Sequence, residues 1–510
     1  MYDKPETGEK RVITNGNVSN SRSCSTTTQH KNGASAEHNG ASASGADEAL
    51  SFQFARIEKR QGVAVVTICD PPANTLTYDM VAQLEEVFFE LSLAGDVQAV
   101  VLTGEGERFF SGGVNIGMLR TSSAHYNSNF LLYAAEVFEI IDTAPFLVVA
   151  AINGHVTGGG LELALVADWR LAIEGTYNLG FPEVRLGVIP GLGGTQRLSR
   201  LVGPGTALEL ITQGEFISVS RAQELGIVAR VLSRENFLPA AVSLTRERLH
   251  NTPPIARPAA PAIPWQCPRK PLAGYERQGR IGIITLTRDC HDASPLQVIW
   301  ALNRAILVAR LDDALEALLI THSGSELHFG NAPVDEFTWN YSQLVLGRLE
   351  SFPRLCVFAF SATLDPLATE LALACDYRVL SSGKAAREIV FSSTAASRRR
   401  AQLLPLRPQI PAGDTYVTGA QAQKQGLVKV LDSTSWPDSI LKWMTRFVSP
   451  RGASKALGYA KLAIAKGLAL PASQGVLLER HLQEQLFRGC DGPEGMRAYL
   501  EKRTAVFQGE

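Results

Sequence analysis

Two glutamates and three glycine-rich segments carry the residue types from which this sequence could build a reaction site. Glu162 follows the run Gly158-Gly-Gly160 with only Leu161 between them, and Glu183 follows Phe181-Pro182. Two carboxylates in different surroundings can act as one general base and one general acid, as the addition of water to a double bond requires. Taken singly, Glu162 also suits a helix-dipole carboxylate and Glu183 a solvated loop acid, so the pair carries the hypothesis.

The glycine-rich segments are Ser111-Gly-Gly113, Gly158-Gly-Gly160 and Pro190-Gly-Leu-Gly-Gly194. None matches the spacing of a dinucleotide fingerprint or of a phosphate-binding loop. A glycine turn at the start of a helix directs free N–H groups and the helix dipole at one point. We therefore expect the N–H groups of Gly112 and Gly159 to form an oxyanion hole for a carbonyl substrate. The alternative is that these glycines serve only tight turns and close packing.

The elements that must position these residues alternate between strand-like and helix-like segments from Phe52 onward. This alternation predicts an α/β fold with parallel strands. Gly112 would follow the second of these strands, and Gly159 would lie just before a helix. The expected strands cover residues 63–69, 99–103 and 146–152, and the expected helices cover 78–93, 134–142, 161–172 and 238–250.

The pattern occurs twice in the chain. Glu162–Arg170 returns as Glu370–Arg378, and Arg221–Leu232 returns as Ala420–Leu431. An internal repeat of this kind indicates two homologous domains. We predict a disordered tail (1–50), a catalytic domain (51–252), a proline-rich linker (253–272), a second, degenerate domain (273–440) and a C-terminal helical cap (441–510).

Composition excludes several classes of function. The 510 residues include 49 Lys and Arg against 50 Asp and Glu, so the net charge of −1 provides no basic surface for nucleic acid or for an anionic membrane. No apolar run reaches the ~18 residues that a membrane-spanning helix needs, and the N-terminus lacks the pattern of a signal peptide. The seven scattered cysteines favour reduced thiols over disulfides or a zinc site. We expect a cytoplasmic protein without a metal site.

Four segments together resemble one family, and they are Asp70-Pro-Pro-Ala-Asn-Thr-Leu-Thr77, Phe110-Ser-Gly-Gly-Val-Asn-Ile116, Ile152-Asn-Gly-His-Val-Thr-Gly-Gly-Gly-Leu-Glu162 and Phe181-Pro-Glu-Val-Arg-Leu-Gly-Val-Ile-Pro-Gly-Leu-Gly-Gly-Thr-Gln-Arg-Leu198. They resemble the enoyl-CoA hydratase/isomerase (crotonase) superfamily, and specifically its hydratase branch. The resemblance is close over residues 52–250 and looser over 275–510. It implies two ββα spiral domains of the crotonase type, with helices closing the second.

The resemblance also implies roles for particular residues. Gly112 and Gly159 would be the oxyanion-hole donors, and Glu162 and Glu183 would hold and activate water. Substrate-binding roles would fall to Gly158, Gly191 and Asn115, the last of which replaces the aspartate usual in the family. The presence of both glutamates favours hydration over isomerisation.

The implied substrate is a 2-enoyl thioester carried on CoA or on the phosphopantetheine of an acyl-carrier protein, with no metal or redox cofactor. The implied assembly is a homo-oligomer, a trimer or a dimer of trimers. Two other enzyme activities remain open: enoyl-CoA isomerase, and dehydratase of carrier-bound polyketide intermediates. A non-catalytic scaffold that binds acyl thioesters is the alternative from another class.

The second copy lacks most of these residues. Leu367 aligns with Gly159, Pro366 with Gly158 and Asn331 roughly with Gly112, whereas Glu370 still matches Glu162. The Glu183 region aligns with residues 390–393, and the long glycine motif has become 396–404. We therefore predict that the second domain is a pseudo-enzyme. In the first copy, His155 is expected to be structural rather than catalytic.

Overall fold

The computed structural model describes residues 48–251, 266–323, 327, 329–330, 332–360, 364–381, 388–393, 413–431, 438–467 and 469–509. The chain divides into two compact units, residues 25–260 and residues 261–510 together with 1–24. We call them the N-terminal unit, described over 48–251, and the C-terminal unit, described between 266 and 509. The predicted tail lies outside the described residues up to 47, and so do residues 253–265 of the predicted linker.

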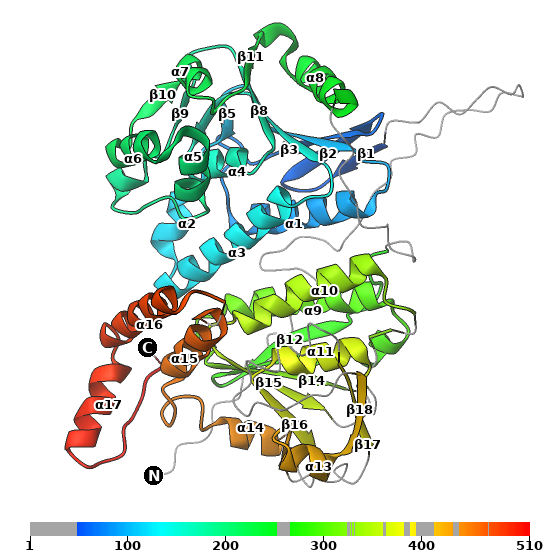
Figure 1. Cartoon of the computed structure of the whole chain (residues 1–510), viewed down its shortest axis with the longest axis vertical. Coiled ribbons are helices and arrows are strands. Elements are labelled where there is room, and N and C mark those ends of the chain that lie inside the picture. Colours follow the sequence, from blue (N-terminus) through cyan, green and yellow to red (C-terminus); the bar gives the residue numbers. More distant parts are fainter. Residues whose placement is uncertain are drawn as a thin grey trace, which may run out of the picture. The chain divides into compact units, whose positions relative to one another are not determined.

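The N-terminal unit is built on a seven-stranded sheet in the order β1-β2-β3-β4-β6-β8-β11 (Figure 1). The pairs β1–β2 and β2–β3 are antiparallel, and every later pair is parallel. The strands are β1 (Glu48–Ser51), β2 (Ala55–Arg60), β3 (Val63–Ile68), β4 (Ala99–Gly104), β6 (Leu147–Ile152), β8 (Trp169–Ile173) and β11 (Arg230–Leu232).

A second sheet in this unit has four short strands in the order β10-β9-β7-β5. They are β5 (Phe109–Ser111), β7 (His155–Thr157), β9 (Asn178–Gly180) and β10 (Phe216–Ser218). The helices are α1 (Tyr78–Leu93), α2 (Ile116–Thr121), α3 (Ala124–Asp142), α4 (Gly159–Leu165), α5 (Gly194–Val202), α6 (Pro204–Gln213), α7 (Val219–Glu224) and α8 (Phe237–Asn251), with single turns η1 (Glu183–Leu186) and η2 (Arg234–Asn236).

Two helices illustrate why these segments fold as they do. The hydroxyl of Thr77 caps α1 by accepting the N–H of Met80, which satisfies one of the otherwise unpaired N–H groups of the first turn. Helix α8 packs on the seven-stranded sheet, where Phe237 and Ala241 join the valines of β3, β4 and β6 in one apolar cluster.

The predicted helix over 161–172 is only partly correct. Helix α4 ends at Leu165, and Trp169 begins strand β8, which pairs in parallel with β6. Between the helix and the strand, Asp168 accepts the N–H of Val148 at 2.8 Å. Arg170 donates to the carbonyl oxygens of Ala167 (2.5 Å) and Ile227 (2.8 Å). These bonds hold a strand in a segment whose apolar pattern also suits a helix.

The C-terminal unit repeats the architecture of the first sheet. Its six strands run in the order β12-β13-β14-β15-β16-β19, which corresponds to β2-β3-β4-β6-β8-β11, with one antiparallel pair followed by parallel pairs. The strands are β12 (Ala273–Gln278), β13 (Ile281–Leu286), β14 (Ala317–His322), β15 (Leu355–Phe360), β16 (Tyr377–Ser381) and β19 (Lys429–Leu431), and β17 (Glu388–Ser393) pairs separately with β18 (Gly413–Thr418). The predicted internal repeat is thereby confirmed.

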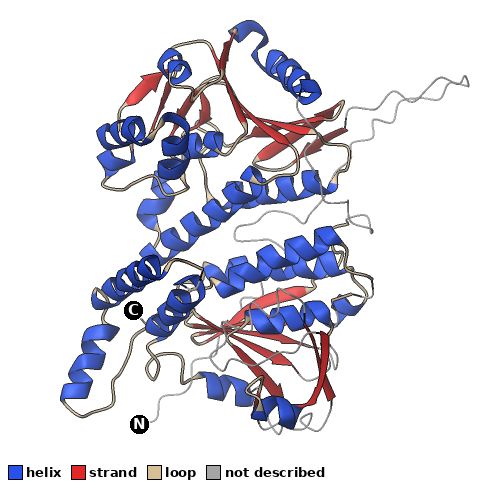
Figure 2. Cartoon of the chain, in the orientation of Figure 1, coloured by secondary structure: helices blue, strands red, loops and turns tan. Residues whose placement is uncertain are grey.

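Helices cover this sheet and extend beyond it (Figure 2). They are α9 (Pro295–Arg310), α10 (Glu336–Glu350), α11 (Pro366–Ala374), α13 (Gly419–Lys424), α14 (Asp438–Met444), α15 (Ser454–Gly467), α16 (Ala472–Phe487) and α17 (Asp491–Leu500), with one single turn η3 (Arg288–His291). Helices α15–α17 confirm the predicted C-terminal helical segment. Within the parts of the chain that the structure describes, no helix combines the length and apolar character needed to cross a membrane.

The repeated Asp-x-Arg motif makes the same bonds in both units. Asp376 accepts the N–H of Cys356 at 2.7 Å, as Asp168 does from Val148. Arg378 donates to the carbonyl oxygens of Cys375 (2.9 Å) and Leu427 (2.6 Å). The repeat thus preserves a structural pair that fixes the strand after α4 or α11.

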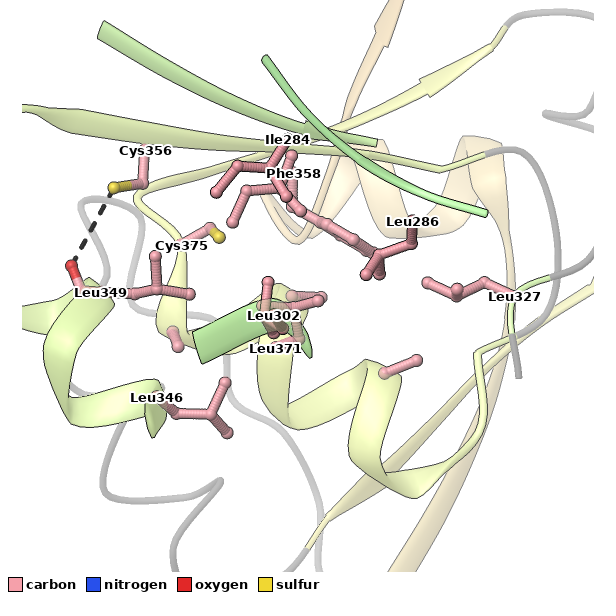
Figure 3. Close-up of a cluster of buried hydrophobic side chains, with 14 of the residues drawn as sticks. Ile284, Leu286, Leu302, Leu327, Leu346, Leu349, Cys356, Phe358, Leu371 and Cys375 are labelled. Carbon is pink, nitrogen blue, oxygen red and sulfur yellow. Dashed lines mark hydrogen bonds between the residues drawn. The ribbon is translucent and has the colours of Figure 1, made fainter. Parts of the chain in front are cut away.

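Lys461 of α15 ties the helical segment to the core of the C-terminal unit. Its Nζ lies 2.9 Å from Oδ2 of Asp376 and 2.8 Å from the carbonyl oxygen of Leu349. Burial lowers the pKa of Lys461, but the charge of Asp376, its hydrogen bond to Lys461 and the nearby thiols of Cys356 and Cys375 together outweigh this effect, and the net pKa is raised. Beside this pair lie the buried Cys356 and Cys375, and the Sγ of Cys356 faces the carbonyl oxygen of Leu349 (Figure 3). Burial raises the pKa of Cys356 to about 12.

Replacing Lys461 with Met should destabilise the C-terminal unit by about 3–5 kcal/mol, because it leaves the Asp376 carboxylate buried without its cation. In calorimetry, we expect the transition of the C-terminal unit to shift to lower temperature. The control is Lys466→Met, at an exposed position of the same helix, which should leave that transition unchanged. Equal effects of the two substitutions would contradict an anchoring role for Lys461.

Candidate active site

Glu162 lies in the first turn of α4 and is 2% exposed. Its Oε1 accepts two backbone N–H groups, from Leu192 at 2.7 Å and from Gly194 at 2.8 Å. Burial raises the pKa of Glu162, whereas these two hydrogen bonds and the charge of Arg197 oppose the rise. The carboxylate is thus fixed in one orientation by donors that favour its ionised form.

Glu183 begins the single turn η1, and its carboxylate lies beside Gly158, the residue just before α4. A Cβ added to Gly158 would lie 2.9 Å from its Oε1. Its Oε2 is buried and has no hydrogen-bond partner among the described residues. Burial raises the pKa of Glu183 to about 7, its own backbone N–H opposes the shift, and the charge of Glu162 adds to it. The structure therefore brings the two predicted carboxylates together in different states of solvation.

The three glycines before Glu162 each have a separate structural reason. Gly158 has a φ of 54°, and a side chain there would also meet Glu183. A Cβ on Gly160 would lie 2.5 Å from the carbonyl oxygen of Ser111, so Gly160 allows α4 to pack against β5. A Cβ on Gly159 would lie 3.3 Å from the backbone nitrogen of Val114.

The backbone N–H groups of Gly159 and Val114 lie close together. Gly159 is the first residue of α4, where an N–H has no carbonyl four residues earlier within the helix. Val114 bridges to Leu76, and the hydrogen bonds of that bridge use the carbonyl of Gly113 (2.8 Å) and the N–H of Asn115 (3.1 Å). The N–H of Val114 points to the opposite side, and the described residues offer it no backbone acceptor. Neighbouring N–H groups without acceptors are the arrangement that binds an oxyanion.

The prediction that Gly112 supplies one of these donors is contradicted by its hydrogen bonding. The N–H of Gly112 donates to the carbonyl oxygen of Ala73 at 2.7 Å. Its own carbonyl accepts the hydroxyl of Thr157 at 3.0 Å. Gly112 therefore joins the loop at residue 73 to β7, and Val114, two residues further along, carries the open N–H.

Two other predicted site residues have different surroundings. Asn115 caps α2, because its Oδ1 accepts the N–H of Met118 at 2.9 Å and its Nδ2 donates to Thr75 at 3.2 Å. Gly191 is exposed, and a Cβ there would meet only Leu131, at 3.8 Å. Substrate contacts of Asn115 and Gly191 stay predictions.

His155 has the surroundings expected of a structural residue. Its Nδ1 accepts the N–H of Asn178 at 3.0 Å. Its ring lies 5.3 Å from that of Phe109 and 5.4 Å from that of Tyr177, measured between ring centroids. These contacts join β7 to β5 and to the loop before β9.

In the C-terminal unit, the region that corresponds to the start of α4 is the start of α11, and the side chain of Asp365 occupies it. The carboxylate of Asp365, just before α11, accepts the N–H groups of Ala368 (2.7 Å) and Phe329 (2.5 Å). Leu367, which aligns with Gly159, is buried in the apolar core, and Glu370 is fully buried. Asn331 and residues 396–404 lie outside the described residues, as do the side chains of 390–393.

Comparisons with known proteins identify the family of the chain. Residues 58–265 match the family model "Enoyl-CoA hydratase/isomerase". The short-chain-enoyl-CoA hydratase of Clostridium acetobutylicum is 35% identical over 240 residues, which cover 46% of this chain and 91% of that protein. The crotonyl-CoA hydratase of Syntrophomonas wolfei is 35% identical over 191 residues, covering 37% of this chain and 73% of that protein.

Among solved structures, DspI of Pseudomonas aeruginosa is 32% identical, with 40% of this chain and 77% of that chain covered and a TM-score of 0.38. The family match, over residues 58–265, includes Glu162 and Glu183. The chain is an enzyme that belongs to the enoyl-CoA hydratase/isomerase family.

Proposed function

We propose that the N-terminal unit adds water to a 2-enoyl thioester, or removes it from the corresponding 3-hydroxyacyl thioester. The observation that supports this most is the meeting of two differently solvated carboxylates, Glu162 and Glu183, at one glycine turn. Beside that turn lie the open N–H groups of Val114 and Gly159, which we assign as the oxyanion hole in place of the pair with Gly112.

The roles of the two glutamates follow from their surroundings. Glu162, held by two N–H donors, is the base: it takes a proton from the water whose oxygen bonds to Cβ. Glu183, with a pKa of about 7, is the acid: it gives its proton to Cα. As Cβ is attacked, negative charge moves to the thioester oxygen, where Val114 and Gly159 stabilise it. Proton exchange with solvent then restores the starting protonation of both glutamates.

Having both carboxylates at one site favours hydration over isomerisation, since a shift of the double bond needs a single group that moves one proton. The proposed chemistry requires no metal or redox cofactor. The substrate is an acyl thioester, for which CoA and an acyl-carrier protein remain the two carriers. Dehydration of carrier-bound polyketide intermediates would use the same residues in reverse.

We propose further that the C-terminal unit does not bind the thioester, because Asp365 already accepts the N–H of Ala368 in the first turn of α11 and the N–H of Phe329, and because Leu367 replaces the glycine of the N-terminal unit. Titration of the full chain with butyryl-CoA, a saturated thioester that cannot be hydrated, should reveal one site per chain. Two equivalent sites would contradict a non-catalytic second unit.

The proposed function is tested by incubating the full chain with crotonyl-CoA and following the loss of enoyl absorbance together with formation of 3-hydroxybutyryl-CoA. A 3-enoyl-CoA of the same length serves as the isomerase substrate. We expect hydration of crotonyl-CoA to be much faster than isomerisation. Isomerisation alone would favour the isomerase reading, and binding without turnover would favour the scaffold.

The pH dependence of the reaction should reflect Glu183. Turnover in either direction needs one proton on the glutamate pair, on Glu183 for hydration and on Glu162 for dehydration. With a pKa of about 7 for Glu183, kcat/KM should fall as the pH rises above about 7, approaching tenfold per pH unit. Measurements of kcat/KM for crotonyl-CoA and for 3-hydroxybutyryl-CoA between about pH 5 and about pH 9 should show the same basic limb. A flat profile up to about pH 9 would contradict this assignment.

A further inference from the structure

The backbone of Leu192 is bound on both of its polar sides. Its N–H donates to Oε1 of Glu162 at 2.7 Å, and its carbonyl oxygen accepts Nη1 of Arg197 at 3.0 Å. The backbone of Leu192 therefore links the guanidinium of Arg197 to the carboxylate of Glu162, which is assigned as the base. The mechanism above uses Glu162 but leaves Arg197 without a role.

Arg197 is itself anchored to a helix outside this loop. Its Nε and Nη2 both donate to Oδ2 of Asp142, near the end of α3, at 3.1 and 3.0 Å. Nη2 also lies 3.5 Å from the carboxylate of Glu139 on the same helix. The Arg197 side chain is 19% exposed, whereas the side chains of Asp142 and Glu139 are 43% and 68% exposed, so the guanidinium is largely buried and its carboxylate partners lie at the surface. The guanidinium thus spans from α3 to the loop that holds Glu162.

The neighbouring glycines allow this approach. Gly193 has a φ of 100°, and a Cβ on it would lie 2.2 Å from Nη1 of Arg197. A Cβ on Gly194 would lie 2.9 Å from Oε1 of Glu162. One glycine therefore makes room for the guanidinium and the next makes room for the carboxylate, so this short loop can contact both groups.

We propose that Arg197, anchored by Asp142, is a positioning residue that holds the Leu192 and Gly194 N–H groups on Glu162 and so keeps this base oriented toward the substrate. The inference rests on the proposed function, because it assigns Arg197 a role through Glu162. It goes beyond the expected catalytic set, in which the long glycine motif contributed only Glu183 and Gly191.

The physical effect acts on the ionised form of Glu162. The two charged groups that act on this carboxylate are Arg197, from α5, and Glu183, from η1. Arg197 favours ionisation of Glu162 through its charge and through the N–H donors that it fixes. Without Arg197, Glu162 should become harder to ionise, whereas the surroundings of Glu183 should change little.

The test compares Arg197→Met with Arg200→Met in the full chain. Arg200 is an exposed arginine of the same helix, and no polar contact of its side chain is found among the described residues. We expect Arg197→Met to lower kcat for crotonyl-CoA by about 10- to 100-fold, the range typical of partners that orient a functional group, with a smaller change in KM. The acidic limb of the pH profile should move to higher pH, and the basic limb should stay where it is. Arg200→Met should match the wild type in all of these.

Asp142→Asn is the second variant, and it carries the test if Arg197→Met does not fold. It keeps Arg197 but weakens its anchor, so it should shift the acidic limb in the same direction by a smaller amount. An unchanged acidic limb in the folded variants would overturn the proposal, even with a reduced rate, because a purely structural role would lower activity without that shift. Full activity of Glu162→Gln would instead overturn the proposed function itself.

Discussion

Replacing Glu183 with Gln should lower kcat for hydration of crotonyl-CoA by about 10²–10⁴-fold, the usual contribution of a positioned general acid. Gln has nearly the same shape but cannot give a proton to Cα. Glu162→Gln should cause a loss of similar size, because the attacking water then lacks its base. The measurement is the loss of enoyl absorbance at saturating substrate.

The matched control for both variants is Glu235→Gln, at an exposed position of the same unit, which should retain the wild-type rate. The double variant should be scarcely slower than either single variant, since groups that act as one unit are not additive. A rate within about threefold of the wild type for either single variant would remove that glutamate from the mechanism.

Unfolding should not explain the loss in Glu183→Gln. The pKa of Glu183 in the folded unit, about 7, lies above the ordinary value of 4.5. Such a group favours the folded state at low pH, and this contribution disappears as the pH rises through about 7, because the folded state must then ionise a buried carboxyl. Gln cannot ionise, so at pH values above 7 the variant should unfold at a temperature no lower than the wild type.

Gly159→Ala should lower hydration by about 10²–10³-fold, the cost of losing an oxyanion-hole donor. The added methyl group would lie 3.0 Å from Cγ2 of Val114 and 3.3 Å from its nitrogen, and would therefore occupy the space that the thioester oxygen needs. Gly159→Leu, which copies Leu367 of the C-terminal unit, should abolish turnover.

The control for Gly159→Ala is Gly205→Ala in α6, where an added Cβ has nothing within 4 Å and φ is not positive. This variant should have wild-type kinetics. Both variants should keep the circular dichroism of the wild type. Normal turnover by Gly159→Ala would contradict the placement of the oxyanion hole between Val114 and Gly159.

The features that can be predicted from the sequence depend on local pattern. Helix α1 occupies the predicted residues 78–93, because apolar spacing and the Thr77 cap act over a few neighbouring positions. Glu162 and Glu183 are chosen from their residue type and from the glycines around them; the structure places both near the start of α4, and their catalytic roles stay predictions. The internal repeat could be predicted from pairs of similar sequence segments, and the matching strand order of the two units confirms it.

The errors concern features that depend on contacts between distant residues. Choosing Val114 instead of Gly112 requires knowing which way each peptide points, and that is set by the bridge to Leu76 and the bond to Ala73. The end of α4 is determined by the bond between Asp168 and the start of β6. Arg197 belongs to the glycine-containing segment 181–198, but the sequence does not show that its side chain bonds to Asp142 and to the carbonyl oxygen of Leu192.

The central claim is that the N-terminal unit alone performs the chemistry through Glu162 and Glu183. The most direct test measures kcat/KM for crotonyl-CoA in the full chain and in the Glu162→Gln, Glu183→Gln double variant, whose C-terminal unit is intact. We predict that the wild-type chain forms 3-hydroxybutyryl-CoA and that the double variant does not exceed the rate without a general acid or base, at least about 10²-fold lower. Turnover by the double variant at the wild-type rate would contradict the account, because the activity would then reside elsewhere in the chain.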